Sequence, residues 1–141
     1  MRIAVIDGQG GGIGKHITQV FRRWFADTIE IIALGTNATA TFLMLKAGAN
    51  EGATGENAII KNVAEVDVIV GSVAVLAADS MLGELTPKMA EAIGKSKAKK
   101  FLLPLNRAGI SIAGIKDEPL PHQIEDLVRL LREYKEECKN V

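Results

Sequence analysis

Five glycines fall within the seven positions 8–14, in the stretch Asp7-Gly-Gln-Gly-Gly-Gly-Ile-Gly-Lys15. The stretch follows an apolar run at residues 3–6 and precedes a segment in which apolar residues recur at helical spacing. Glycine has no Cβ, so a main chain rich in glycine lets a ligand approach closely. The start of a helix adds unpaired amide groups and a partial positive charge, which favour an anion. These residues therefore predict a binding site for a phosphate group.

The spacing of the glycines resembles two known phosphate-binding loops without completing either. Gly8-x-x-x-Gly12-x-Gly14 resembles the cofactor loop of short-chain dehydrogenases, although the usual dinucleotide fingerprint fails because position 13 is Ile. Gly10–Lys15 resembles a Walker-type loop because it ends in Gly-Lys. However, His16 stands where a Ser or Thr would hold magnesium. A third interpretation also stays open, in which the glycine-rich turn only allows close helix packing.

The residues that would carry out a reaction are missing from the expected positions. A short-chain dehydrogenase needs a Tyr with a Lys four residues later, but the one tyrosine, Tyr134, is followed at that spacing by Cys138. A nucleotide hydrolase needs a carboxylate at the C-terminal end of a strand to position magnesium, and Asp7 alone has such a place. The catalytic residues therefore stay unknown, and no metal site is predicted.

The second expected strand ends without the acidic residue that commonly binds a ribose in dinucleotide-binding folds. The stretch Leu34-Gly-Thr-Asn37 offers Thr36 and Asn37, which can hydrogen-bond a ribose or a phosphate but carry no charge. This weakens an NAD assignment and leaves NADP, a mononucleotide such as FMN, or another small phosphorylated ligand. Alternatively, Asn37 or Thr39 simply caps the helix that follows.

The predicted binding site combines the glycine loop with the ends of the other strands. The amides around Ile13 and Gly14 hold the phosphate, and Asp7 orients a ribose, a water or a metal. Arg107, after the last strand, supplies a cation whose planar donors match phosphate or carboxylate. The complete set is Asp7, Gly8, Gly10, Gly11, Gly12, Ile13, Gly14, Thr36, Asn37, Ser72 and Arg107. A second glycine-rich stretch, 48–57, forms either part of the pocket wall or only a connector.

Short apolar runs alternate with helical patterns, which is typical of a parallel sheet covered on both faces. Strands are expected at residues 2–6, 30–34, 67–70 and 100–105, a weaker one near 48–53, and a final edge strand, parallel or antiparallel, at 110–115. Helices are expected at 13–25, 39–47, 55–64, 87–94 and 121–138. The first helix has an apolar stripe formed by Ile13, Ile17, Val20, Phe21, Trp24 and Phe25. The pattern predicts an α/β fold with a Rossmann-like, doubly wound, mostly parallel sheet in three α/β/α layers.

Composition limits the classes of partner. The 141 residues fit a single domain spanning 1–141, with an amphipathic helix at 121–138. The formal net charge is zero, so we expect neither nucleic acid nor a membrane surface as a partner. The N-terminus lacks the pattern of a signal peptide, which predicts a cytoplasmic protein. A domain this small would borrow substrate contacts from a second subunit, so we expect a homodimer.

Several motifs together resemble a small bacterial family catalogued as a domain of unknown function. They are Val5-Ile-Asp-Gly-Gln-Gly-Gly-Gly-Ile-Gly-Lys15, Ala33-Leu-Gly-Thr-Asn-Ala38, Gly48–Ile59, Ser80-Met-Leu-Gly-Glu-Leu-Thr-Pro87 and Pro104-Leu-Asn-Arg107. The resemblance runs to about Ile115 and does not clearly include the last helix. It implies a bacterial cytoplasmic protein, and it carries over no catalytic residues because the family has no established activity.

Two functions follow from the predicted site. The first is a redox enzyme that binds a nicotinamide or flavin nucleotide, NAD(P) or FMN, through the loop after the first strand. The alternative is a non-catalytic sensor that binds a nucleotide and passes a conformational signal to a partner, which the missing acid–base pair favours.

Overall fold

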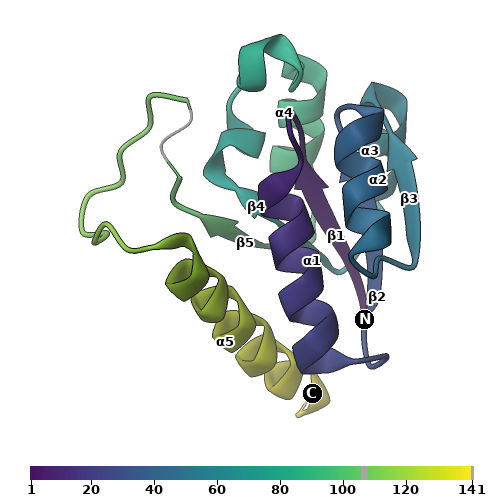
Figure 1. Ribbon diagram of the computed structural model, residues 1–141, viewed down its shortest axis with the longest axis vertical. Coiled ribbons are helices and arrows are strands. Elements are labelled where there is room, and N and C mark those ends of the chain that lie inside the picture. The colour runs from purple at the N-terminus through teal and green to yellow at the C-terminus, as the bar shows by residue number, and fades with distance from the viewer. Residues whose placement is uncertain (106–107, 141) are drawn as a thin grey trace.

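The computed structural model describes residues 1–105 and 108–140, and its helices and strands alternate along most of that length (Figure 1). The strands are β1 (Arg2–Asp7), β2 (Glu30–Gly35), β3 (Glu51–Thr54), β4 (Val68–Ser72) and β5 (Lys99–Leu103). The helices are α1 (Gly12–Phe25), α2 (Ala38–Lys46), α3 (Glu56–Val63), α4 (Pro87–Lys95) and α5 (Leu120–Lys139). Two short 3-10 helices, η1 (Val73–Leu76) and η2 (Met81–Gly83), join β4 to α4.

The five strands form one parallel sheet in the order β3-β2-β1-β4-β5. β1 lies at the centre, with Asp7 opposite Gly35 of β2 and Val5 opposite Val70 of β4. The central strands are buried along nearly their whole length, as expected for a sheet covered on both faces. The predicted α/β class and doubly wound, parallel sheet are confirmed.

Alternate residues of each strand face opposite layers, because successive side chains of a strand point to opposite sides. Ile3 and Val5 of β1 belong to a core cluster that includes residues of α1, α2 and α5, among them the fully buried Phe21. Ala4 and Ile6 belong to the other core cluster, which includes residues of α3 and α4. The sheet is therefore the middle of three layers, with α1, α2 and α5 on one face and α3 and α4 on the other (Figure 1).

The chain changes face at the centre of the sheet. From β1 it builds outward through β2 to β3 with α1 and α2 on one face, and it then returns through α3 to β4 and β5 on the other side of β1. In sheets of this kind ligands bind outside the carboxyl ends of the strands at the point of reversal. That point lies between β1 and β4, next to the glycine loop.

Two sequence expectations about these elements are wrong. Residues 110–115 form no strand; their backbone is irregular and turns at 113–114. Gly109 and Gly114 have positive φ (+69° and +85°), so the chain turns near each end of this segment, and residues 111–119 are exposed. Trp24 is 57% exposed instead of joining the buried stripe of α1, and its ring lies 5.8 Å from the guanidinium of Arg132 on α5.

The weaker expectation of a strand near 48–53 is confirmed, since β3 forms one edge of the sheet. In the part of the chain that the structure describes, no helix combines the length and the apolar character needed to cross a membrane.

Candidate functional site

The glycine loop joins β1 to α1 at the point where the sheet reverses. Its turn is closed by a hydrogen bond from the Gly11 amide to the Gly8 carbonyl (3.0 Å), and Gly11 caps α1 with a φ of +74°. A residue with a Cβ rarely adopts this left-handed conformation. The loop is therefore a tight, fixed turn that presents the first amides of α1 at the end of β1.

Asp7 closes the loop from inside. Its side chain is buried, and its carboxylate accepts hydrogen bonds from the Gly8 amide (2.8 Å) and the Gly14 amide (2.7 Å). A carboxylate at the start of a helix also interacts favourably with the helix dipole. The Gly14 amide, one of the main-chain donors expected to bind a phosphate, is therefore bound by the protein's own side chain.

A second carboxylate, that of Glu84, holds the loop from outside. One oxygen, Oε1, accepts hydrogen bonds from the Gln9 amide (2.8 Å), Thr36 Oγ1 (2.7 Å) and Asn37 Nδ2 (2.8 Å). The bonds from Thr36 first, then from Gln9 and Asn37, hold the pKa of Glu84 below its ordinary value, although burial acts in the opposite direction. Glu84 is therefore ionised at neutral pH beside the end of β2.

Sequence reasoning missed Glu84 because it comes from a distant part of the chain. It follows η2, 75 residues after Gln9, whereas the acidic residue of dinucleotide-binding folds lies near the end of the second strand. Thr36 and Asn37 are a signal in the sequence for such a carboxylate. Two uncharged donors at a strand end can bind a carboxylate of the protein itself as well as a ligand. Nothing in the sequence around Glu84 indicates where its side chain points.

Three of the five glycines are required by the fold of the free protein. A Cβ on Gly8 would lie 2.3 Å from Thr36 Oγ1, and a Cβ on Gly14 would lie 2.7 Å from the Met44 sulfur. A Cβ on Gly11 would lie 2.8 Å from the Ala40 Cα, in addition to the strain of its positive φ. Close packing of α1 on α2 and of Glu84 on the loop explains these three residues.

Gly10 and Gly12 have no such explanation. Neither has a positive φ, and a Cβ built on either would meet nothing within 4 Å. Both residues are exposed. Among the described residues, the hydrogen bonds of this loop engage the amides of Gly8, Gln9, Gly11 and Gly14. The outer side of the loop is thus an open surface that carries Gly10 and Gly12.

The remaining predicted site residues have the following places. Asn37 caps α2 by accepting a hydrogen bond from the Ala40 amide (2.9 Å), and it also donates to Glu84, so it serves the helix and the loop together. Ser72 is buried at the end of β4, where its Oγ accepts a hydrogen bond from the Ala74 amide (3.2 Å). Arg107 lies outside the described residues. The structure therefore gathers Asp7, the glycines, Thr36 and Asn37 around one loop.

Comparison with known proteins identifies a family but no activity. Residues 2–136 match a protein family described as Domain of unknown function (DUF3842). The chain belongs to this family. The match extends through most of α5, so the family includes most of the last helix, which the resemblance in sequence motifs did not clearly include. No curated protein and no solved structure matches the chain.

Proposed function

We propose that this protein binds a nucleotide or dinucleotide, with a phosphate group on the outer side of the glycine loop. The amides of Gly10, Gly12 and Ile13 are the donors, and the partial positive charge of α1 adds to them. One observation carries the proposal: Gly10 and Gly12 are glycines although the free protein has room for a side chain at both positions. A loop that served packing alone would account for Gly8, Gly11 and Gly14 but not for these two.

Glu84 supports the same proposal at the ribose. Its Oε1 takes three donors, whereas its Oε2 has no hydrogen bond to the described residues. It stands at the end of β2, where an acidic side chain of a dinucleotide-binding fold accepts a ribose hydroxyl. A carboxylate there repels a 2′-phosphate, so we infer that NAD, or another nucleotide with a free 2′-hydroxyl, binds more tightly than NADP.

In this arrangement Asp7 shapes the loop instead of contacting the ligand, because both of its carboxylate oxygens accept loop amides. The two carboxylates also limit where the phosphate can lie. An anion near Gly8 or Gln9 would be repelled by Asp7 and Glu84, whereas Gly10 and Gly12 lie on the open side of the turn. A redox reaction with NAD or FMN would need further groups, which a second copy of the chain in a homodimer would supply.

The experiment measures thermal unfolding of the purified protein with saturating NAD, NADP, FMN, ATP or coenzyme A. A ligand at 100 times its Kd stabilises the folded state by about 2.7 kcal/mol, which raises the Tm by several degrees in a domain of this size. We expect a rise with NAD that Gly12→Asp removes. The matched control is Gly94→Asp, because Gly94 is an exposed glycine on α4 where an added Cβ would meet nothing within 4 Å. If no ligand raises the Tm, the proposal is wrong.

A second candidate function, a nucleotide sensor without catalysis, is favoured by the segment that carries Glu84. Asp79, Met81 and Leu82 have positive φ (+65°, +57° and +56°), which costs on the order of 1–3 kcal/mol for each residue. Leu82 is 96% exposed, which is unusual for a large apolar side chain. A nucleotide that binds Glu84 would alter the hydrogen bonds that hold residues 79–85. The position in which Leu82 is presented to a partner would then change.

Hydrogen exchange and turnover assays separate the two functions. A sensor shows altered amide exchange at residues 79–85 when the nucleotide binds, with no oxidation or reduction of NAD(H) or flavin. Leu82→Ser should leave nucleotide binding unchanged, because this side chain points into solvent. Turnover of the nicotinamide or flavin by the purified protein would instead establish the redox enzyme.

A further inference from the structure

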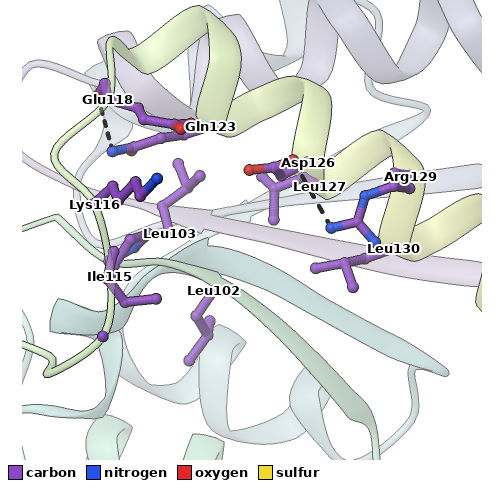
Figure 2. Close-up of a pocket in the computed structure, with 12 residues that line it drawn as sticks. Leu102, Leu103, Ile115, Lys116, Glu118, Gln123, Asp126, Leu127, Arg129 and Leu130 are labelled. Atoms are coloured by element: carbon purple, nitrogen blue, oxygen red, sulfur yellow. Dashed lines mark hydrogen bonds and ion pairs between the residues drawn. The ribbon is translucent and has the colours of Figure 1, made fainter.

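A cavity of about 390 Å³ lies between β5, residues 114–118 and α5 (Figure 2), and no residue of the glycine loop lines it. Its walls are largely apolar, with side chains from the strand, the segment and the helix. The apolar residues are Leu102, Leu103, Pro104, Ile115, Leu127 and Leu130. A volume near the lower limit of typical ligand pockets, about 300–1,000 Å³, suits a small molecule.

Gln123 gives this cavity a polar group that the protein leaves unsatisfied. The residue is only 9% exposed, and it lines both this cavity and an adjoining one of about 160 Å³. Its Nε2 donates to the Glu118 carbonyl (3.0 Å), which fixes the orientation of the amide. Its Oε1 is buried and has no hydrogen-bond partner among the described residues. An unpaired buried acceptor is unfavourable, so a donor group that hydrogen-bonds to Gln123 Oε1 would be stabilised there.

The charged residues around the cavity carry both signs. Lys116 forms no ion pair with the described residues, and Figure 2 shows its side chain extending toward Leu103 and Gln123. On the α5 side, Asp126 forms an ion pair with Arg129, and its Oδ1 lies 3.8 Å from Arg129 Nη2. This distance is too long for a hydrogen bond, so the Asp126 carboxylate can still accept one. A polyphosphate does not fit such a mixed lining, because Glu118 and Asp126 balance the two cations.

We propose that the cavity binds a small zwitterion with an apolar body, the chemical class of the apolar α-amino acids. The ammonium group donates to Gln123 Oε1 and to the Asp126 carboxylate. The carboxylate group of the ligand pairs with Lys116. The apolar side chain lies on the leucines of β5 and α5, where burial removes it from water. This site is independent of the nucleotide site, since the two share no residue.

The test is a titration of the isotopically labelled full-length protein with L-leucine, followed by amide chemical shifts. Two truncated ligands are the matched controls: 3-methylbutylamine lacks the carboxylate, and 4-methylpentanoate lacks the ammonium group. We expect saturable shifts around Leu103, Ile115 and Gln123 with leucine, and at least tenfold weaker binding of each truncated ligand. The proposal is overturned if leucine gives no saturable shifts there, or if a truncated ligand binds as tightly as leucine.

Two substitutions test the roles of individual groups. Gln123→Met keeps the length of the side chain and removes the acceptor. Lys116→Met removes an exposed cation, so we expect this variant to fold as the wild type does. Each should weaken leucine binding at least tenfold. Lys88→Met, an exposed change on α4, should leave it unchanged. Wild-type affinity in folded Gln123→Met or Lys116→Met protein would refute the assignment of that group and with it the zwitterion site.

Discussion

This chain has two glycine-rich segments, the first at residues 7–15 and the second at residues 48–57. They look alike in sequence, but their glycines have different roles. In the second segment every glycine has a structural cause: Gly48 and Gly55 have positive φ (+123° and +100°), and a Cβ on Gly52 would lie 2.8 Å from Thr41 Cγ2. In the first segment, Gly10 and Gly12 have none. The number of glycines therefore does not identify a ligand site. Glycines that the free protein does not require are the ones that point to a ligand.

The groups that hold the two segments also differ. Arg22 of α1 holds the second segment by donating to the Gly48 carbonyl (3.0 Å) and to Asn50 Oδ1 (2.6 Å). The first segment is held by two carboxylates, Asp7 and Glu84, that accept from its amides. The second segment also forms the edge strand β3, which identifies it as a connector built into the sheet.

The largest effect on stability is expected from Gly11→Ala in the first segment. The new Cβ would combine a left-handed φ with a contact to the backbone of Ala40, so we expect a loss of about 3 kcal/mol in the free energy of unfolding. Chemical denaturation of the variant and the wild type measures the difference. A loss below about 0.5 kcal/mol, the range of ordinary surface substitutions, would show that the loop adapts to the new side chain. It would also weaken the distinction between glycines that the fold requires and those, such as Gly12, that it does not.

Gly12→Asp is expected to weaken NAD binding and to leave the stability of the fold nearly unchanged. Because its side chain enters open space, the free energy of unfolding should change by less than about 0.5 kcal/mol. The added carboxylate would stand where the phosphate binds, so NAD affinity should fall about a hundredfold, or about 2.7 kcal/mol. Calorimetric titration measures the affinity, with Gly94→Asp as the control. Unchanged affinity would place the ligand elsewhere.

The positions of the strands along the chain and of the loop after the first strand could be predicted from the sequence, because apolar runs and helix signals are local. The alternation of buried runs with amphipathic segments also predicts the parallel sheet. Glu84 could not be predicted in the same way, since its place depends on how a segment with three non-glycine residues of positive φ folds back to the loop after β1. The glycines that serve packing could not be separated from the spare ones either, because the distinction rests on neighbours such as Ala40 and Met44.

Gly55→Ala tests the second segment, with a smaller expected loss of stability. A Cβ would find open space at Gly55, so only the backbone conformation (φ +100°, ψ 178°) opposes the change, at a cost of about 2 kcal/mol. Denaturation measures this loss, and NAD affinity of the folded variant should equal that of the wild type. Loss of NAD binding in the folded variant would instead make the second segment a wall of the nucleotide site.

A smaller loss of stability than in Gly55→Ala is expected from Glu84→Gln, which keeps the shape of the side chain and removes its charge. Three hydrogen bonds would lose the assistance of that charge, so the variant should be about 1 kcal/mol less stable at pH 7. The folded-state pKa of Glu84 lies below its ordinary value of 4.5, chiefly because Thr36 and the Gln9 amide donate to the carboxylate. The stabilisation is therefore complete above pH 4.5 and is lost as the pH falls through the folded-state pKa.

The difference between wild type and Glu84→Gln in denaturation experiments should accordingly shrink below pH 4.5. For the choice of nucleotide, Glu91→Gln is the matched control, because Glu91 lies on the surface of α4 and pairs with Lys95 far from the loop. Only Glu84→Gln should narrow the preference for NAD over NADP, since only Glu84 stands where a 2′-phosphate would be repelled. If Glu84→Gln lost stability as expected but kept the preference for NAD over NADP, Glu84 would only support the loop. Both carboxylates that hold the first segment, Asp7 and Glu84, would then have the structural role that Arg22 has for the second segment.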